Sequence, residues 1–375
     1  MNEDLTAYRR YFPITQRYAF LNHASVAPLS TRVQEAMQTL IGARVTGEDL
    51  REDGETVVAN LREMCAELVG GEPEEIALTR NTSHGLNIAA NGILWRPGDN
   101  LITAQTEFPA NVYPWTNLSR RGVEVRFAPA PDNRILAKDI EKLMDERTRL
   151  VALSFVEFYT GYRNDLTAIG QICDDRGISF SVDAIQGLGA LPLDARAAKL
   201  DFLASGAAKW LMGPIGTGFF WCRKEFTEHL IPAVAGWRGV VDTDDYFRYD
   251  SPLRSDARRF EEGSPNVAGL WGFEASLSLL LEVGIPRIEA RIMALTDYLI
   301  AGLQDRNYPI ISPIASRSER SGIITFLPKS GSAEELHQNI TEADVVVSQR
   351  GPGIRVSPHF YNTEEDIDRL LDVLP

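Results

Sequence analysis

The residue of this chain with the most distinctive chemical setting is Lys209, which lies just before a glycine-rich segment at 213–218. A lysine amine that has lost its proton is a nucleophile that condenses with carbonyl groups. Ser205 precedes the lysine, so hydroxyl and backbone N–H donors surround this position. Donors of this kind bind phosphate groups. The segment therefore predicts a reactive lysine beside a phosphate-binding loop, which is how pyridoxal phosphate (PLP) is held.

A carboxylate at Asp183 supplies the second group that PLP needs. Asp183 follows the apolar run 178–182, which predicts a buried strand, and ligands of open α/β sheets bind at the carboxyl ends of strands. A carboxylate on the pyridine nitrogen keeps it protonated and lets the ring accept electrons. Taken singly, Lys209 is more typical of a surface charge and Asp183 of a helix cap. Together they favour a PLP site.

Several further motifs occur in the order found in one enzyme family. They are NTS at 81–83, EFPAN at 107–111, SVDAIQ at 181–186, SGAAK at 205–209, GPIGTG at 213–218, RFEEGSPN at 259–266 and IRVSPHFYN at 354–362. This set resembles the aminotransferase class V family of PLP-dependent enzymes, which includes cysteine desulfurases, isopenicillin N epimerase-like proteins and kynureninases. The resemblance covers nearly the whole chain.

The resemblance implies a role in cofactor binding for each matching residue. Lys209 is expected to form the Schiff base and, with Asp183, to be catalytic. Asp183 is expected at the pyridine nitrogen, Gln186 at the phenolic oxygen, Phe108 stacked on the ring, Thr82, Ser83 and Ser205 at the phosphate, and Ser264 at the phosphate of the neighbouring subunit in a homodimer. Outside the motifs, Thr82 and Ser83 are typical of a helix N-cap, Gln186 of a surface residue and Phe108 of a core.

Three residues are expected to bind the substrate. Arg355 follows a Gly-Pro-Gly turn, and its planar guanidinium suits a bidentate pair with an α-carboxylate. Its alternative is an exposed salt bridge. Asn22 and His23 resemble the family's N-terminal segment on the substrate side, although a lone histidine is more often structural.

The chain departs from the cysteine desulfurases at three places. Desulfurases carry a nucleophilic cysteine on a loop before the carboxylate-binding arginine, and the stretch 345–352 holds none. Ala208 replaces the histidine usual before the lysine, and Phe158 replaces an asparagine near the ring oxygen. The missing thiol argues against persulfide chemistry.

Composition narrows the class of protein. The 375 residues carry a formal charge of −14, which argues against nucleic acid and anionic membranes as partners and favours a small polar substrate. The resemblance implies that this substrate is an amino acid. The cysteines Cys65, Cys173 and Cys222 are widely spaced, which predicts neither a metal site nor disulfides and favours a cytoplasmic setting. No membrane-spanning run or signal-like N-terminus is apparent.

Strand-like runs alternate with helical patterns from residue 76 to residue 222. The expected strands are 76–79, 101–104, 123–127, 150–154, 178–182, 202–205 and 218–222. This alternation predicts an α/β fold with a mainly parallel central sheet covered by helices, which in the family is the PLP-dependent transferase fold type I. We expect residues 1–30 to pack on a smaller α+β C-terminal domain at 267–375, and residues 31–266 to form the large PLP-binding domain.

The resemblance implies an enzyme that acts on an α-amino acid through an external aldimine. Transamination or β-elimination of the C–S lyase type comes first, because Lys209 serves both as acid and base and neither reaction needs a cysteine. Epimerisation is the alternative enzymatic reaction. It needs a second proton donor on the opposite face of the ring, and His23 is the candidate for that role. A PLP-binding protein without turnover is a further alternative, for which Ala208 and Phe158 are the indications.

Overall fold

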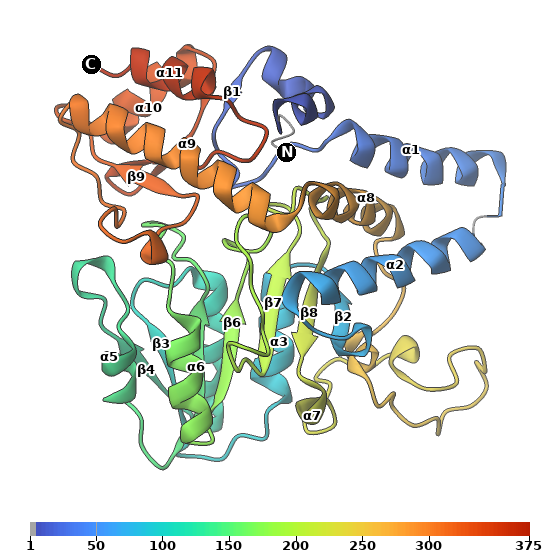
Figure 1. The fold of residues 1–375 in the computed structure, drawn as a ribbon. Helices are drawn as coiled ribbons and strands as arrows, with labels where there is room; N and C mark the ends of the chain where they lie inside the picture. Colours follow the sequence, from blue (N-terminus) through green and yellow to red (C-terminus); the bar gives the residue numbers. More distant parts are fainter. Residues whose placement is uncertain (1–4, 50) are drawn as a thin grey trace.

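The computed structural model describes residues 5–49 and 51–375 and shows a seven-stranded central sheet with a smaller second sheet beside it (Figure 1). The strands of the central sheet are β2 (Ile76–Thr79), β3 (Asn100–Ala104), β4 (Glu124–Ala128), β5 (Thr148–Ser154), β6 (Ser179–Asp183), β7 (Phe202–Gly206) and β8 (Gly218–Cys222). Their order across the sheet is β2-β8-β7-β6-β5-β3-β4. The expected strands match these elements, with ends that differ by two residues at most.

The central sheet is parallel except at β8, which runs antiparallel to both of its neighbours, β2 and β7. The connection from β7 to β8 spans residues 207–217 and includes Lys209, and so short a link reaches an antiparallel neighbour, whereas a parallel one needs a longer crossover. The expectation of a mainly parallel sheet is therefore confirmed, and the one reversed strand follows from the loop that carries Lys209.

Helices cover both faces of the central sheet, as the alternation of side chains along β5 requires. Val151 and Leu153 face one hydrophobic core, and Leu150 and Ala152 face another. The first core is completed by α2 (Arg51–Val69), α6 (Leu166–Asp175) and α8 (Val267–Val283), and the second by α3 (Thr82–Gly92). In Figure 1, α3 lies behind the sheet and α6 in front of it. Helix α1 (Thr31–Thr46) packs on α8, and α4 (Tyr113–Thr116), α5 (Ala137–Glu141) and α7 (Lys224–Thr227) are short.

The C-terminal region forms its own core around a three-stranded antiparallel sheet. Its strands are β9 (Ile324–Phe326), β11 (Ser348–Arg350) and β12 (Gly353–Val356), in the order β11-β12-β9. The core is completed by residues of α9 (Ile285–Asp305), α10 (Ala333–Glu342) and α11 (Glu364–Asp372). Helix α9 contributes Ile288 to the large core and Leu299 to the small one. The change from one hydrophobic core to the other thus falls inside α9, and the domain boundary at residue 267 stays a prediction.

The N-terminal segment packs on the C-terminal region. Strand β1 (Ala19–Phe20) pairs in parallel with β10 (Val345–Val346). Arg9 donates two hydrogen bonds to the Asp366 carboxylate, at 2.7 and 2.8 Å. The Phe12 ring stacks on Tyr361 with 3.8 Å between the ring centroids. These contacts bring residues 19–27 alongside the strands that carry Arg355.

A helix that crosses a bilayer needs about 20 mainly apolar residues. Within the described residues, no individual helix is both long and apolar enough to cross a membrane. Helices α8 and α9, which are bent by 78° relative to each other, reach that length and composition only when they are taken together.

Candidate active site

Lys209 lies in the loop that follows β7, and the N-terminal segment holds that loop from the other side. The backbone N–H of Ala27 donates to Ala208 O at 2.9 Å, and that of Met212 donates to Lys209 O at 2.9 Å. Gly216 has a φ of +85°, a left-handed conformation that favours glycine, and it turns the chain into β8. The lysine is therefore presented at the carboxyl end of the sheet by a closed loop.

Burial and nearby charges shift the proton affinities of Lys209 and Asp183. Burial lowers the pKa of Lys209 to about 8; the Asp183 carboxylate opposes this shift, and the cations of Arg355 and Arg350 add to it. Burial raises the pKa of Asp183 to about 6, against the Ile185 backbone N–H and the Lys209 cation. Near neutral pH, a fraction of the Lys209 amine is thus free to act as a nucleophile or base.

Asp183 is the last residue of β6 and is 2% exposed. Its Oδ1 accepts a hydrogen bond from the Ile185 backbone N–H at 3.0 Å. One carboxylate oxygen is thereby held by the main chain, which helps to set the orientation of the group. A strand-end carboxylate held in this way suits a protonated heterocyclic nitrogen.

Gln186 is buried, and both ends of its amide are engaged. Nε2 donates to Ala24 O at 3.1 Å, and Oε1 accepts from Trp210 Nε1 at 2.9 Å. One N–H of the Nε2 group is left over for an oxygen acceptor. The amide therefore ties the N-terminal segment to the Lys209 loop and still keeps a donor for the expected phenolic oxygen.

The expected phosphate contacts gather at the start of α3 and the end of β7. Gly206 N donates to Thr82 Oγ1 at 2.9 Å, which joins the two elements directly. The buried Ser205 donates to Gly206 O at 3.2 Å, and Ser83 is exposed in the first turn of α3. Asn81 caps the helix by accepting from His84 N at 2.9 Å. Hydroxyl groups and a helix N-terminus thus lie together, as anion binding requires.

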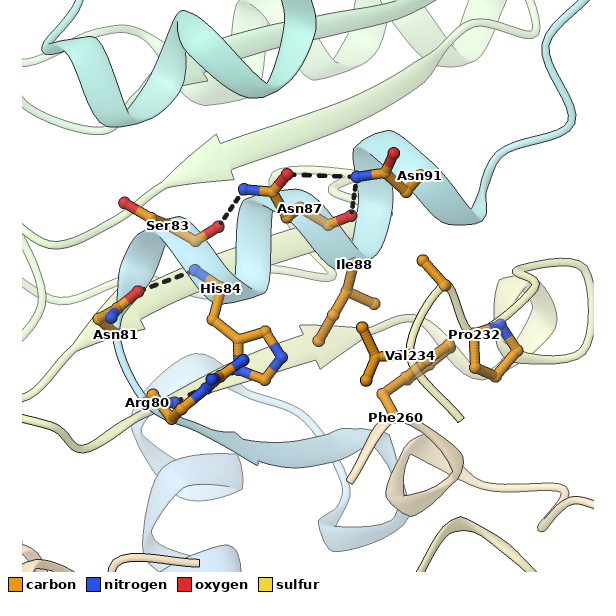
Figure 2. Close-up of a pocket in the computed structure, with 11 residues that line it drawn as sticks. Arg80, Asn81, Ser83, His84, Asn87, Ile88, Asn91, Pro232, Val234 and Phe260 are labelled. Carbon is orange, nitrogen blue, oxygen red and sulfur yellow. Dashed lines mark hydrogen bonds between the residues drawn. The ribbon is translucent and has the colours of Figure 1, made fainter. Parts of the chain in front are cut away.

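A cavity of about 420 Å³ lies along the exposed side of α3 (Figure 2). It is lined by Ser83, His84 and Asn87 of the helix, together with Val234 and Phe260 from later segments. A second cavity, of about 660 Å³, shares Ser83 and reaches Phe108. Lys209 lines neither of these two cavities, so the candidate site is defined here by the contacts of Lys209. Ser83, an expected phosphate contact, lines both cavities.

Two aromatic rings stand beside the Lys209 amine. Lys209 Nζ lies 5.4 Å from the centroid of the Phe108 ring. Phe108 packs edge-on against Phe158, with 5.2 Å between centroids and 72° between planes. Phe108 is 42% exposed, which is unusual for a core residue. The geometry favours a wall for a flat ligand over the alternative of an ordinary core aromatic.

Arg355, on β12, is joined by a second arginine that the sequence analysis did not identify. Arg355 is 1% exposed; Nη1 donates to Phe158 O at 2.7 Å and Nη2 donates to Ser25 Oγ at 2.8 Å. Arg350 Nη2 donates to the same Ser25 oxygen at 3.1 Å. Within the described part of the chain, Arg355 Nε is buried without a hydrogen-bond partner. Both guanidinium groups thus donate to the Ser25 hydroxyl, and the Arg355 Nε–H group remains as a further donor. An arrangement of this kind suits an anionic ligand.

His23 lies in the interior, with both ring nitrogens engaged. Nδ1 is 2.9 Å from Ser357 O, and Nε2 is 2.8 Å from Tyr361 Oη. Complete burial lowers its pKa to about 4, so the ring is neutral. This arrangement favours a structural role for His23 over the substrate contact expected from the sequence. Asn22, beside it, is partly buried, and its Oδ1 has no partner among the described residues.

Ser264 is exposed on the segment between Phe260 and α8. Its expected role needs a second subunit, so it stays a prediction. Two buried glutamates to which the sequence analysis gave no role lie near the strand end that carries Asp183. Glu107 belongs to the motif at 107–111, and Glu157 belongs to no motif. Among the described residues, no three His, Cys, Asp or Glu side chains are arranged to hold a metal ion.

Comparison with known proteins agrees with this geometry. The family model for the class V aminotransferases matches residues 19–370. A probable cysteine desulfurase of Methanothermobacter thermautotrophicus is 30% identical, over 98% of this chain and 96% of the relative. The isopenicillin N epimerase of Streptomyces clavuligerus is also 30% identical, over 84% of this chain and 82% of the relative. A C-DES structure with glycine covalently linked to its PLP cofactor superposes with a TM-score of 0.90, at 24% identity and 98% coverage of both chains.

The fold and the family define a PLP-dependent enzyme, and the described residues fit that cofactor. A buried lysine of lowered pKa, a strand-end carboxylate and a hydroxyl-bearing helix N-terminus are the groups that PLP requires. The chain belongs to the aminotransferase class V family.

Proposed function

We propose that Lys209 holds the cofactor and moves the α-proton of an α-amino acid substrate. The observation that carries this proposal is the setting of the Lys209 amine, which lies in the loop after β7, 5.4 Å from the Phe108 ring centroid, and is acted on by the charges of Asp183, Arg355 and Arg350. A lysine with a pKa of about 8 accepts and returns protons near neutral pH. Bound PLP supplies the electron sink for the carbanion, and Asp183 is proposed to keep its pyridine nitrogen protonated.

The other cofactor contacts are proposed from the same cluster. Gln186 offers its remaining N–H to the phenolic oxygen, and Phe108 covers one face of the ring. Thr82, Ser83 and Ser205 are proposed to bind the phosphate at the start of α3, and Ser264 to reach the phosphate of a second subunit in a homodimer. A cytoplasmic location remains a proposal from composition.

The substrate carboxylate is proposed to bind at Arg355 with help from Arg350. Both guanidinium groups converge on Ser25 Oγ, and Arg355 Nε has no partner among the described residues. A carboxylate that takes over these donors would satisfy both cations. Asn22 is proposed to lie on the substrate side, because it forms a parallel β-bridge with Ser357, the residue that follows β12.

We propose transamination or β-elimination and not persulfide transfer. Persulfide transfer needs an accessible thiolate, and residues 345–355 contain no cysteine. All three cysteines of the chain are buried. Burial raises the pKa of Cys173 and of Cys222 to about 12, and it also raises that of Cys65. None of these thiols is suited to act as a nucleophile.

A variant with Cys65, Cys173 and Cys222 changed to Ala or Ser tests this exclusion. We expect the variant to keep its bound cofactor and its activity, with some loss of stability from altered packing. A folded, yellow variant that has lost activity would restore a cysteine-dependent mechanism.

Epimerisation is the second candidate, because a relative that is 30% identical is named isopenicillin N epimerase. An epimerase needs a proton donor on the face of the substrate opposite Lys209. Both nitrogens of His23 are engaged in the interior, so this residue does not favour that reaction. A cofactor-binding protein without turnover is less favoured, because Lys209, Asp183 and Arg355 are all present in one cluster.

To distinguish these reactions, the purified holoenzyme is incubated with single amino acids, and keto acid, ammonia, sulfide and optical rotation are assayed. Amino-group transfer to an added keto acid supports transamination. Ammonia and keto acid without an acceptor support β-elimination. A change in optical rotation alone would overturn both and establish epimerisation.

A further inference from the structure

The three-stranded sheet of the C-terminal region has one apolar face and one polar face. Side chains alternate along a strand, and residues paired across an antiparallel ladder share a face. Ile354 and Val356 of β12 face the small hydrophobic core. Ile324 and Phe326 of β9 face the same core. The opposite face therefore carries polar side chains from all three strands, namely Thr325, Ser348, Arg350 and Arg355.

Two buried polar groups on this polar face have no partner. Arg355 is 1% exposed, and Ser348, the residue paired with it on β11, is 7% exposed. Within the described residues, Arg355 Nε and Ser348 Oγ both lack a hydrogen-bond partner. The great majority of buried polar groups in proteins have partners. Idle groups on two paired residues thus indicate a place for the oxygen atoms of a ligand.

Arg350 and Arg355 bring two positive charges to the polar face. Among the described residues, the hydrogen bonds of both guanidinium groups go to neutral oxygens. Arg355 donates to Phe158 O and Ser25 Oγ, and Arg350 donates to the same Ser25 oxygen and to Gln349 O. Burial and the Arg350 charge together lower the pKa of Arg355 to about 9. Two cations that share one hydroxyl repel each other, so negative charge is favourable here.

Of the two arginines, Arg355 is the one connected directly to the surroundings of Lys209. It binds the carbonyl oxygen of Phe158, whose ring packs on Phe108. The centroid of the Phe108 ring lies 5.4 Å from Lys209 Nζ. Burial lowers the pKa of Lys209 most, and of the two arginines Arg355 lowers it more than Arg350 does. An α-carboxylate therefore belongs at Arg355, and Arg350 is left for a group farther along the ligand.

We propose that Arg350 determines specificity by binding a second carboxylate, so that the substrate is an acidic α-amino acid of the aspartate or glutamate kind. This inference rests on the proposed function, in which Arg355 takes the α-carboxylate. A single carboxylate offers acceptors to both arginines, but it carries one negative charge against two positive ones. A substrate with two carboxylates balances both cations and supplies acceptors to Arg355 Nε and Ser348 Oγ.

The test compares each acid with its amide, which has nearly the same shape and no side-chain charge. The holoenzyme is titrated with aspartate, asparagine, glutamate and glutamine, and the visible absorbance of bound PLP reports binding. We expect the wild type to bind one acid with a Kd at least about tenfold below that of its amide. Arg350→Gln should lose at least about tenfold in affinity for that acid and less than about threefold for the amide.

Two further variants separate charge recognition from general effects. Arg350→Lys keeps the positive charge but not the planar fork, so it should retain a preference for the acid of about threefold or more. Arg176→Gln removes a cation that pairs with Glu141 on the surface, and it should leave all affinities within about twofold. Melting temperatures show that each variant is folded.

A loss of affinity confined to the acid, and partly restored in Arg350→Lys, supports the proposal. An equal loss for acid and amide means that Arg350 binds only the α-carboxylate, and a wild type that prefers neither acid means that no second carboxylate is bound. Either result overturns the proposal, as does the same loss in Arg350→Lys as in Arg350→Gln. Failure of the proposed function looks different, because borohydride then labels no lysine or a lysine other than Lys209.

Discussion

Lys209 and Asp183 each move the other's proton affinity, and burial dominates both shifts. The Lys209 pKa falls to about 8 and the Asp183 pKa rises to about 6, so the two groups approach each other in acidity. An amine and a carboxylate in this range exchange protons with a bound ligand more readily than they would at their ordinary values. The proton affinities of both groups therefore depend on how completely water is excluded from the carboxyl ends of β6 and β7.

Removal of the Asp183 carboxylate should separate cofactor binding from turnover. In Asp183→Ala the phosphate donors survive while the pyridine partner is lost, so the purified protein should keep much of its PLP. We expect kcat to fall by about two orders of magnitude or more. Absorbance of bound PLP and steady-state kinetics measure the two effects. Near-normal turnover would show that Asp183 does not serve the pyridine nitrogen.

Arg355→Lys should raise KM for carboxylate-bearing substrates by about tenfold or more, because an ammonium group cannot reproduce a planar fork of donors. The absorbance of bound PLP should not change, since Arg355 contacts Ser25 and Phe158. Arg163→Lys is the control, because Arg163 pairs with Glu289 instead. An unchanged KM would place Arg355 outside the substrate site.

Sequence reasoning identified the residues that sit inside contiguous motifs and missed those that meet only in space. Lys209, Asp183 and Arg355 each belong to a recognisable segment. Arg350 shares Ser25 with Arg355 although 325 positions separate Arg350 from Ser25, and no local pattern reports such a contact.

At the scale of elements, a tight turn after β5 connects the cofactor side of the site to the substrate side. Glu157 N donates to Tyr162 O at 2.8 Å, and Gly161 N donates to Glu157 O at 2.9 Å. Gly161 has a φ of +72° and packs against Ile323 of the C-terminal region. The turn thereby holds the Phe158 carbonyl oxygen where it accepts a hydrogen bond from Arg355 Nη1.

Gly161→Ala should destabilise the protein by about 2 kcal/mol or more, because the new Cβ would overlap the Ile323 carbonyl oxygen and lie 2.8 Å from Ile323 Cβ. Gly177→Ala is the matched control, since Gly177 also has a positive φ, +65°, but has no atom within 4 Å of an added Cβ. Denaturant unfolding of the two variants isolates the steric part. Equal losses would mean that the contact with Ile323 contributes nothing.

The longer strands were predictable because apolar runs bounded by turn residues mark buried strands, and seven of them were expected within two residues of their ends. Strand β1 has two residues, and β12 has four residues that begin at the last glycine of a Gly-Pro-Gly turn. Neither strand is long enough to show the alternation of apolar and polar residues that marks a strand in the sequence. Both form because a partner strand is already present, which is a tertiary cause.

At the scale of the whole molecule, the candidate site closes only where the two ends of the chain meet the central sheet. Ala27 N binds the Lys209 loop, Ala24 O binds Gln186, and Ser25 binds both arginines of the C-terminal region. The N-terminal segment is in turn anchored by Arg9 on Asp366. Cofactor residues from the large core and substrate residues from the small core are thus joined by residues 24–27.

The central claim is that Lys209 carries the cofactor, and borohydride reduction tests it most directly. The purified holoenzyme is reduced, digested and mapped by mass spectrometry, with Lys209→Ala reconstituted in parallel. We expect the reduced pyridoxyl group on the peptide that contains Lys209 and on no other peptide, and none in Lys209→Ala. A label on a different lysine, or no label after PLP has been added to the wild type, would contradict the account.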